Sequence, residues 1–245
     1  IAITNCLNFG NPEKDKIMGQ FVETIDGISQ ACTYLDFPVV SGNVSFYNET
    51  ENRAISPTPT IGGVGLIKNL DFMMTKNLKE IGSNIFVIGK TLGHLNQSEF
   101  FREVLKMNQG PPPEINLFNE KNNGLTLLEL IENNLILSAH DVSLGGILIC
   151  LAEMCIEGKI GAEIYMPKSL IDLNEYFFGE DQGRYIIEIE NEKFTSVIKI
   201  LNKNSVFFEK IGITKKEKLY LKNEFEITID DITKYNNNWF KKYLN

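Results

Sequence analysis

Short apolar segments alternate with longer amphipathic segments along the whole chain, and this alternation limits the folds that it can adopt. Apolar runs predict strands at 1–4, 39–40, 60–67, 84–89, 135–138, 162–165, 184–189 and 206–211. Apolar residues at helical spacing predict helices at 17–35, 97–107, 117–133, 144–156, 192–201 and 229–243, and the charged segment 214–228 predicts a hairpin. Because the elements do not follow in regular β-α-β order, the pattern favours an α+β fold with mixed sheets.

The composition changes near residue 70. Residues 68–83 are polar and charged, which predicts a boundary between a first domain at 1–70 and a second at 71–245. The first part is small for an independently stable domain. The chain also begins with Ile1, in a segment that has the pattern of the middle of a strand. We therefore expect it to be a piece of a longer polypeptide, cut inside the first domain.

Charge and cysteine content exclude several classes of partner. The formal net charge of −8 gives no broad basic surface for nucleic acid or anionic membrane. No segment approaches the roughly 18 apolar residues of a membrane span. The cysteines form no CxxC pair, which is typical of a reducing compartment; they are Cys6, Cys32, Cys150 and Cys155. We expect a cytoplasmic protein without nucleic-acid or membrane partners.

Two polar segments adjoin the first predicted strands, and we expect both to be loops. The first, 5–13, is rich in amide side chains. In the second, 41–49, Gly42 would let a phosphate approach the backbone, Asn43 offers an oxygen to Mg²⁺, and Ser45 offers a hydroxyl to an anionic ligand. Two such loops at neighbouring strand ends indicate a nucleotide site. On pattern alone, loops that satisfy their own backbone explain the segments equally well.

Two further polar segments lie in the second part. In 138–146, Asp141 or Ser143 is suited to a helix cap and the glycine pair to an anion at a helix start. For His140 the pattern favours a structural role over a general base, because no partner residue is evident. The segment 178–184 is equally well explained as a charged turn.

Five segments together resemble a known family. They read AITNCLNFGNPE, PVVSGNVSFYNET, PTPTIGGVGLI, SAHDVSLGGILICLAEM and FGEDQGR. In this order and spacing they resemble the C-terminal part of the phosphoribosylformylglycinamidine synthase family, within the wider aminoimidazole ribonucleotide synthetase superfamily. The resemblance covers nearly the whole chain and weakens after residue 214. It implies an ATP-dependent ligase of purine biosynthesis, which makes formylglycinamidine ribonucleotide from formylglycinamide ribonucleotide and glutamine-derived ammonia.

The resemblance also implies a domain plan and partners. Members of the family contain two tandem pairs of domains, each an A-type half-barrel followed by a B-type α+β domain. Residues 1–70 would then be a partial second A-type, ATP-binding domain, and 71–245 a complete second B-type sandwich domain. The implied partners are the N-terminal half of the enzyme, a glutaminase subunit and a small accessory subunit. Because a bare strand edge is adhesive, we expect homodimerisation through 60–67.

The resemblance assigns roles to individual residues. It implies ATP contacts at Asn5 and Gly42, a Mg²⁺ ligand at Asn43 and a substrate contact at Ser45. The first of these positions is often Asp in the family, so here an amide replaces a charge. The family's catalytic histidines lie in its first A-type domain, so the resemblance implies no catalytic residue in this chain.

A second, auxiliary site is also implied by the resemblance. Its candidate residues are Asp141, Glu180 and Gln182, and Leu144 stands where Asp is common. Two other interpretations of the chain stay open. It is either a non-catalytic module that binds a nucleotide or acts as a scaffold, or another ATP-dependent enzyme of the superfamily, such as a thiamine-monophosphate or selenophosphate kinase.

Overall fold

The computed structural model describes residues 1–244 and divides into two compact units, Ile1–Leu70 and Asp71–Asn245. The first unit has one small apolar core, and the second has two larger ones. Within the described residues, no helix is both long enough and apolar enough to cross a membrane. The mixed content of helices and sheets confirms the predicted α+β class.

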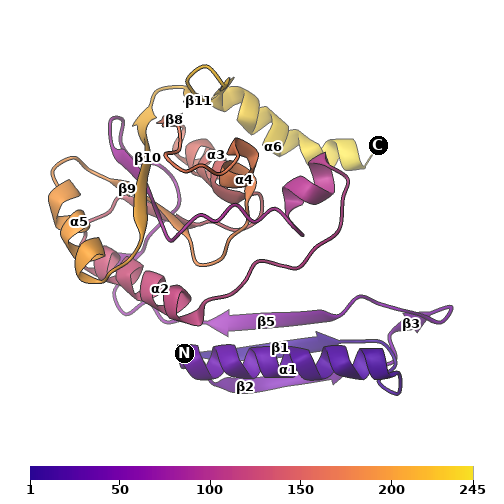
Figure 1. Ribbon diagram of the computed structural model, residues 1–245. Coiled ribbons are helices and arrows are strands. Elements are labelled where there is room, and N and C mark those ends of the chain that lie inside the picture. The colour runs from indigo at the N-terminus through magenta and orange to yellow at the C-terminus, as the bar shows by residue number, and fades with distance from the viewer. Residues whose placement is uncertain (245) are drawn as a thin grey trace. The chain divides into compact units, whose positions relative to one another are not determined.

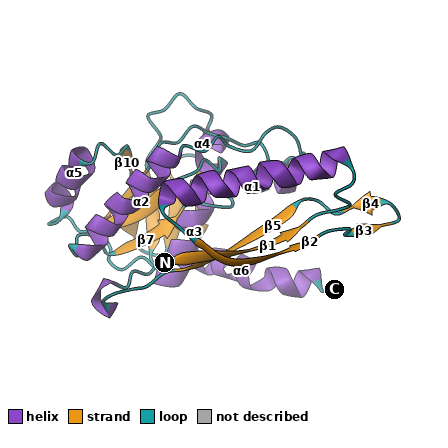
Figure 2. Ribbon diagram, turned by 90° about the horizontal axis from the view of Figure 1, so that it is seen from below, coloured by secondary structure: helices purple, strands orange, loops and turns teal. Residues whose placement is uncertain are grey.

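A three-stranded sheet covered by one helix forms the first unit. The strand β1 (Ala2–Asn8) lies in the centre, parallel to β2 (Val39–Ser45) and antiparallel to β5 (Thr58–Val64). The helix α1 (Asp15–Leu35) runs along one face of this sheet (Figure 2). Leu7 and Ile17 are buried between them. The ring of Phe21 on α1 packs edge-on against other aromatic rings, with centroid distances of 5.4 Å to Phe9 and 5.0 Å to Phe46.

The first two strands are longer than the sequence predicted. β1 continues through Asn8 and β2 through Ser45, so the expectation that Asn5, Gly42, Asn43 and Ser45 lie in loops is wrong. Asn and Gly have low strand propensity, but pairing with a neighbouring strand overrides this preference. The expected loop at 47–59 also contains a short hairpin, β3 (Glu49–Thr50) with β4 (Arg53–Ala54).

A mixed sheet of seven strands forms the middle of the second unit, in the order β12-β11-β8-β10-β6-β9-β7. All neighbouring strands are antiparallel except β11 and β8, which are parallel. The strands are β6 (Asn84–Ile88), β7 (Ser138–Asp141), β8 (Gly161–Ile164), β9 (Tyr185–Ile189), β10 (Phe208–Lys215), β11 (Lys218–Leu221) and β12 (Phe225–Thr228).

Helices cover both faces of this sheet (Figure 1). One core contains Ile85 and Val87 of β6 and side chains of α3 (Gly146–Gly158), α4 (Leu173–Phe178) and α6 (Ile229–Tyr243). The other core contains Phe86 and Ile88 of β6 and side chains of α2 (Leu117–Glu132) and α5 (Phe194–Lys203). Successive side chains of a strand point to opposite faces, so β6 contributes to both cores and is apolar from Ile85 to Ile88.

The segment around residue 100 differs from its prediction. A helix was expected over 97–107, but the structure has only a short π-helix, η2 (Phe100–Val104). The ring of Phe100 stacks on Phe178 at a centroid distance of 4.8 Å, which fixes this turn onto the end of α4. A 3-10 turn, η1 (Leu70–Phe72), spans the boundary between the two units along the chain.

Candidate functional site

Asn5 and Gly42 lie side by side on the paired strands β1 and β2. A Cβ atom built on Gly42 would overlap the Oδ1 atom of Asn5. The absence of a side chain at residue 42 therefore makes room for the amide of Asn5 on the sheet surface. The structure thus brings together the two residues predicted to contact ATP, one on the central strand of the sheet and one on its edge strand.

Strand alternation separates the four candidates of the first unit into two pairs. Asn5 and Gly42 share the face that carries Leu7 and the α1 core, while Asn43 and Ser45 point to the opposite face. On that opposite face, Ser41 Oγ donates a hydrogen bond to Thr4 Oγ1 over 2.7 Å. The face opposite the helix is therefore polar.

The strand β2 has a free edge. Within the described residues β2 pairs only with β1, so its other side leaves backbone N–H and C=O groups unpaired. Asn48 Nδ2 contacts Ser45 at the end of β2, donating to its carbonyl oxygen over 2.9 Å and to Oγ over 3.4 Å.

A pair of residues that sequence analysis did not single out ties the two polar segments together. Lys14 Nζ lies 2.8 Å from Glu49 Oε1, and the backbone N–H of Asn11 donates to the same oxygen over 3.1 Å. These contacts with Lys14 and Asn11 lower the pKa of Glu49. Opposite charges 35 residues apart offered no local pattern by which the contact could be recognised.

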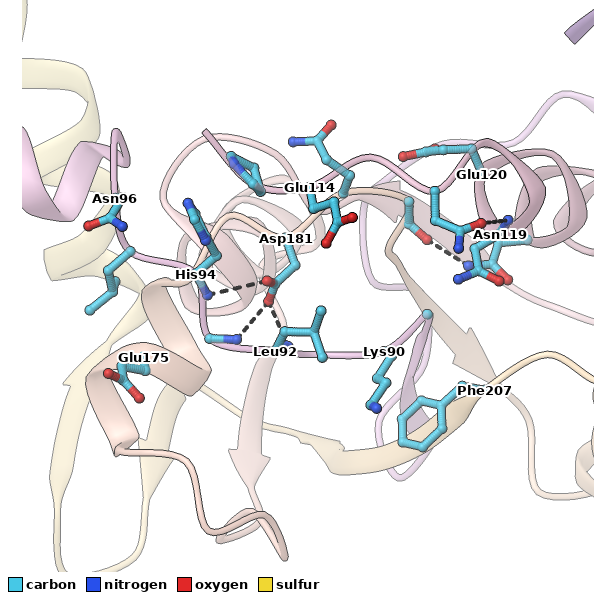
Figure 3. A pocket seen from close by; sticks show the side chains of 18 of the residues that line it. Lys90, Leu92, His94, Asn96, Glu114, Asn119, Glu120, Glu175, Asp181 and Phe207 are labelled. Carbon is cyan, nitrogen blue, oxygen red and sulfur yellow. Dashed lines mark hydrogen bonds between the residues drawn. The ribbon is translucent and has the colours of Figure 1, made fainter. Parts of the chain in front are cut away.

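In the segment 178–184, the acidic side chains accept backbone hydrogen bonds. Asp181 Oδ2 accepts from the N–H groups of Leu92 and Gly93, both over 2.9 Å, and Oδ1 accepts from His94 over 3.2 Å (Figure 3). Glu180 Oε1 accepts from the N–H groups of Glu99 and Gly145, both over 2.8 Å. The two carboxylates therefore hold other segments of the chain in place.

The guanidinium of Arg184 completes this arrangement. The residue is 1 % exposed, and its nitrogens donate to the carbonyls of Asp181 and Gly179 and to Thr91 Oγ1. Burial lowers the pKa of the guanidinium, and the neighbouring Asp181 opposes this change. A Cβ on Gly146 would lie 2.6 Å from the carbonyl oxygen of Phe177, so the start of α3 packs directly on this segment.

Asp141 belongs to a different cluster. His140 Nδ1 lies 3.1 Å from Asp141 Oδ1, and His140 Nε2 lies 2.9 Å from Glu153 Oε2. Lys76 Nζ also contacts Glu153, over 2.9 Å. His140 therefore has partners that the sequence did not reveal.

The auxiliary candidates do not converge on a metal. Across residues 1–244, no three His, Cys, Asp or Glu side chains are placed to hold a metal ion together. Gln182 is exposed, and its Nε2 donates over 3.4 Å to the carbonyl of Glu180. Leu144 is exposed in the loop before α3.

Both units of the chain match models of a known family. The family model described as AIR synthase related protein, C-terminal domain, matches residues 72–222. The model of the N-terminal domain of the same family matches residues 1–67. The chain belongs to the family of AIR synthase related proteins.

Within that family, similar curated proteins share one name. The phosphoribosylformylglycinamidine synthase subunit PurL of Pelagibacter ubique is 55% identical over 244 residues, which is 100% of this chain and 33% of the relative. PurL of Azorhizobium caulinodans is 43% identical over 244 residues, with the same coverage. The chain thus spans about a third of the length of the curated relatives that it matches.

Solved structures of low sequence identity show the same fold. Thermotoga maritima PurL complexed with ATP superposes with a TM-score of 0.69 at 19% identity, over 94% of this chain and 37% of that one. The same protein has been solved with FGAR, with a TM-score of 0.71, and as PurLQS, with a TM-score of 0.67.

Proposed function

We propose that this chain supplies the ATP side of a phosphoribosylformylglycinamidine synthase. The complete enzyme would use ATP to activate the amide oxygen of formylglycinamide ribonucleotide, so that ammonia from glutamine displaces phosphate and gives the amidine. The observation that carries the proposal is the 55% identity along the whole chain to a relative of that name. The ATP- and FGAR-bound structures of T. maritima PurL support the same ligands here.

Within this proposal, the nucleotide lies at the free edge of β2. The backbone of Gly42 and the amide of Asn5 face it, and Ser45 contacts the ribonucleotide. Gly42 supports this placement because any larger residue would collide with Asn5. No charged side chain is needed from Asn5, since an amide can donate to or accept from a nucleotide.

Magnesium is part of the proposal, with Asn43 as one ligand. An amide oxygen is a suitable Mg²⁺ ligand, and this ion is commonly held by few protein groups together with water and phosphate oxygens. Asn43 lies on the polar face of the sheet beside neutral oxygen groups. The other ligands would come from the nucleotide and from protein segments outside this chain, and the ion would offset the charge of the transferred phosphoryl group.

The proposed partners and location follow from the same relatives. The part of the enzyme that precedes this segment in the relatives, a glutaminase and a small accessory subunit would complete the assembly, in keeping with the PurLQS structure. We place this assembly in the cytoplasm. The four cysteines of the chain are free thiols, which supports a reducing compartment.

A chimeric enzyme tests the proposal. The chain would replace the matching third of P. ubique PurL, and ADP release would be measured with FGAR, Mg-ATP and ammonia. We expect turnover in the chimera and a loss of at least about tenfold in kcat/KM for ATP in Gly42→Ala, because the new methyl group displaces Asn5.

Matched variants make the result specific. Gly63→Ala adds a methyl group to β5 where nothing lies within 4 Å, so it should leave the rate unchanged. Asn43→Ala should raise the Mg²⁺ concentration that half-maximal rate requires. An inactive but folded chimera, or equal rates in Gly42→Ala and Gly63→Ala, would overturn the proposed site.

A further inference from the structure

The second unit contains a cavity of about 640 Å³. It lies between the first turns of α2, the segment 89–96 and the turn at 181–183 (Figure 3). Cavities of this size hold small organic molecules. Its walls belong entirely to the second unit, so the proposed ATP contacts on β1 and β2 are not part of it.

The charge of the cavity wall selects cations. Glu114, Glu120 and Glu175 line it, against the single lysine Lys90. Asp181 also lines it, but Arg184 lies 3.8 Å away and offsets its charge. This excess of carboxylates repels phosphates and nucleotides. Burial raises the pKa of Glu120, and no cationic side chain contributes to this change. A half-buried carboxylate is stabilised by a bound cation.

The carboxylates are spread along the cavity. Figure 3 shows Glu175 at one end, Glu114 near the middle and Glu120 at the other end. Within the described part of the chain, no three acidic, His or Cys side chains are close enough to share one metal ion. The spacing therefore suits an extended cation with separated charges better than a single ion.

Amide side chains also line the cavity. They are Asn96, Asn116, Asn119, Asn122, Asn123 and Gln182. Asn123 is only 6% exposed, and its Nδ2 donates to the carbonyl of Gly183 over 2.9 Å. An amide oxygen in the wall is an acceptor for an N–H group of a ligand.

We propose that this cavity binds a linear diamine or polyamine. One ammonium group pairs with Glu120, a second lies toward Glu175, and the chain between them runs along the amide side chains. The amide oxygens accept hydrogen bonds from the amine groups, and the methylene segments contact the ring of Phe207 and the side chain of Leu92 in the wall.

Calorimetric titration of the 245-residue chain with spermidine tests this site. We expect saturable binding at one site and a weakening of roughly tenfold or more in Glu120→Gln, because a charge-assisted hydrogen bond is lost. Glu132→Gln is the matched control. It makes the same change of charge on the same helix, at an exposed residue outside the cavity wall.

Several outcomes would overturn the proposal. Equal weakening in Glu120→Gln and Glu132→Gln would show attraction to the net charge of the chain alone. If spermidine does not bind to the unaltered chain, linear polyamines are excluded as ligands of the cavity. If Glu120→Gln does not fold, Glu175→Gln serves in its place, and unchanged affinity in that folded variant would contradict the extended binding mode. None of these results bears on ATP-dependent turnover, so this inference and the proposed function fail separately.

Discussion

At the scale of single residues, the acidic groups of the segment 178–184 stabilise loops. Asp181 accepts three backbone hydrogen bonds from the segment 92–94, and Glu180 accepts two from segments far apart in sequence. Backbone N–H groups that are withdrawn from water and left unpaired are costly. These carboxylates replace water for five such groups and so define the path of the chain around them.

Replacing Asp181 by Asn tests this role. The variant puts an amide N–H group opposite a backbone N–H group, so we expect a loss of about 1–3 kcal/mol in the free energy of unfolding. Urea denaturation followed by circular dichroism measures it. Asp230→Asn, at an exposed residue, should cost only a few tenths of a kcal/mol. Equal stability of the two variants would show that the hydrogen bonds to Asp181 contribute little.

Glu120 gives a prediction about pH. Burial raises its pKa in the folded chain, so the folded state binds this proton more tightly than the unfolded state does. Its contribution to stability is therefore greatest below the unfolded pKa of about 4.3 and falls as pH rises toward the folded pKa. Gln imitates the protonated form, so Glu120→Gln should match the parent near pH 4 and melt at a higher temperature at pH 7. An equal difference in melting temperature between Glu120→Gln and the parent at both pH values would contradict a raised pKa of Glu120.

At the scale of elements, α3 is the helix on which the second unit most depends. It places Leu151 and Met154 in the larger core, both with no exposed surface. Ile149 on the same helix is 42% exposed. The helix is apolar nearly all round, and its sequence alone does not tell these two environments apart.

Truncation to alanine of one buried and one exposed side chain of α3 tests this difference. Leu151→Ala removes a fully buried side chain and should lower the free energy of unfolding by about 2–5 kcal/mol. Ile149→Ala should cost less than about 1 kcal/mol, since its side chain already contacts water. Thermal or urea unfolding of both variants measures the two losses. Similar losses would contradict the burial of Leu151 and the exposure of Ile149.

Much of the element pattern could be predicted from the sequence. The predicted helices at 117–133 and 229–243 and the predicted strand at 84–89 correspond closely to α2, α6 and β6. The predicted strands that precede Asn5 and Gly42 were too short. Their polar continuations become strands only because they pair with segments distant in sequence.

The candidate sites were predictable to different degrees. The family resemblance grouped Asn5, Gly42 and Asn43, and the register of β1 and β2 pairs Asn5 with Gly42 and Cys6 with Asn43. Their separation onto two faces required the strand bounds. The contacts of Glu180 and of His140 join segments up to 81 residues apart, which no local spacing encodes.

At the scale of the whole molecule, the sheet of the first unit has an exposed strand at one edge. The strand β5 is solvent-accessible along its entire length, with Val64 65% and Ile61 47% exposed. Among the described residues it pairs only with β1. An unpaired apolar edge of this kind promotes pairing with another strand.

We predict that the chain forms a homodimer through this edge. Light scattering should show a mass that rises toward twice 27.8 kDa with concentration. Val64→Lys places a charge on the edge strand and should shift the equilibrium to the monomer, because lysine on an edge strand disfavours pairing with a second strand. A monomer at every concentration for the unaltered chain would exclude this mode of association.

The position of β6 in the second sheet has a consequence for synthesis on the ribosome. Its five residues are completely buried, but its two neighbours, β9 and β10, lie roughly 100 residues or more further along the chain. At a translation rate of about 5–20 residues per second, this apolar strand waits roughly 5–20 seconds for its partners. During that interval the nascent chain presents a segment suited to chaperones, and slower translation of the region would extend its exposure to aggregation.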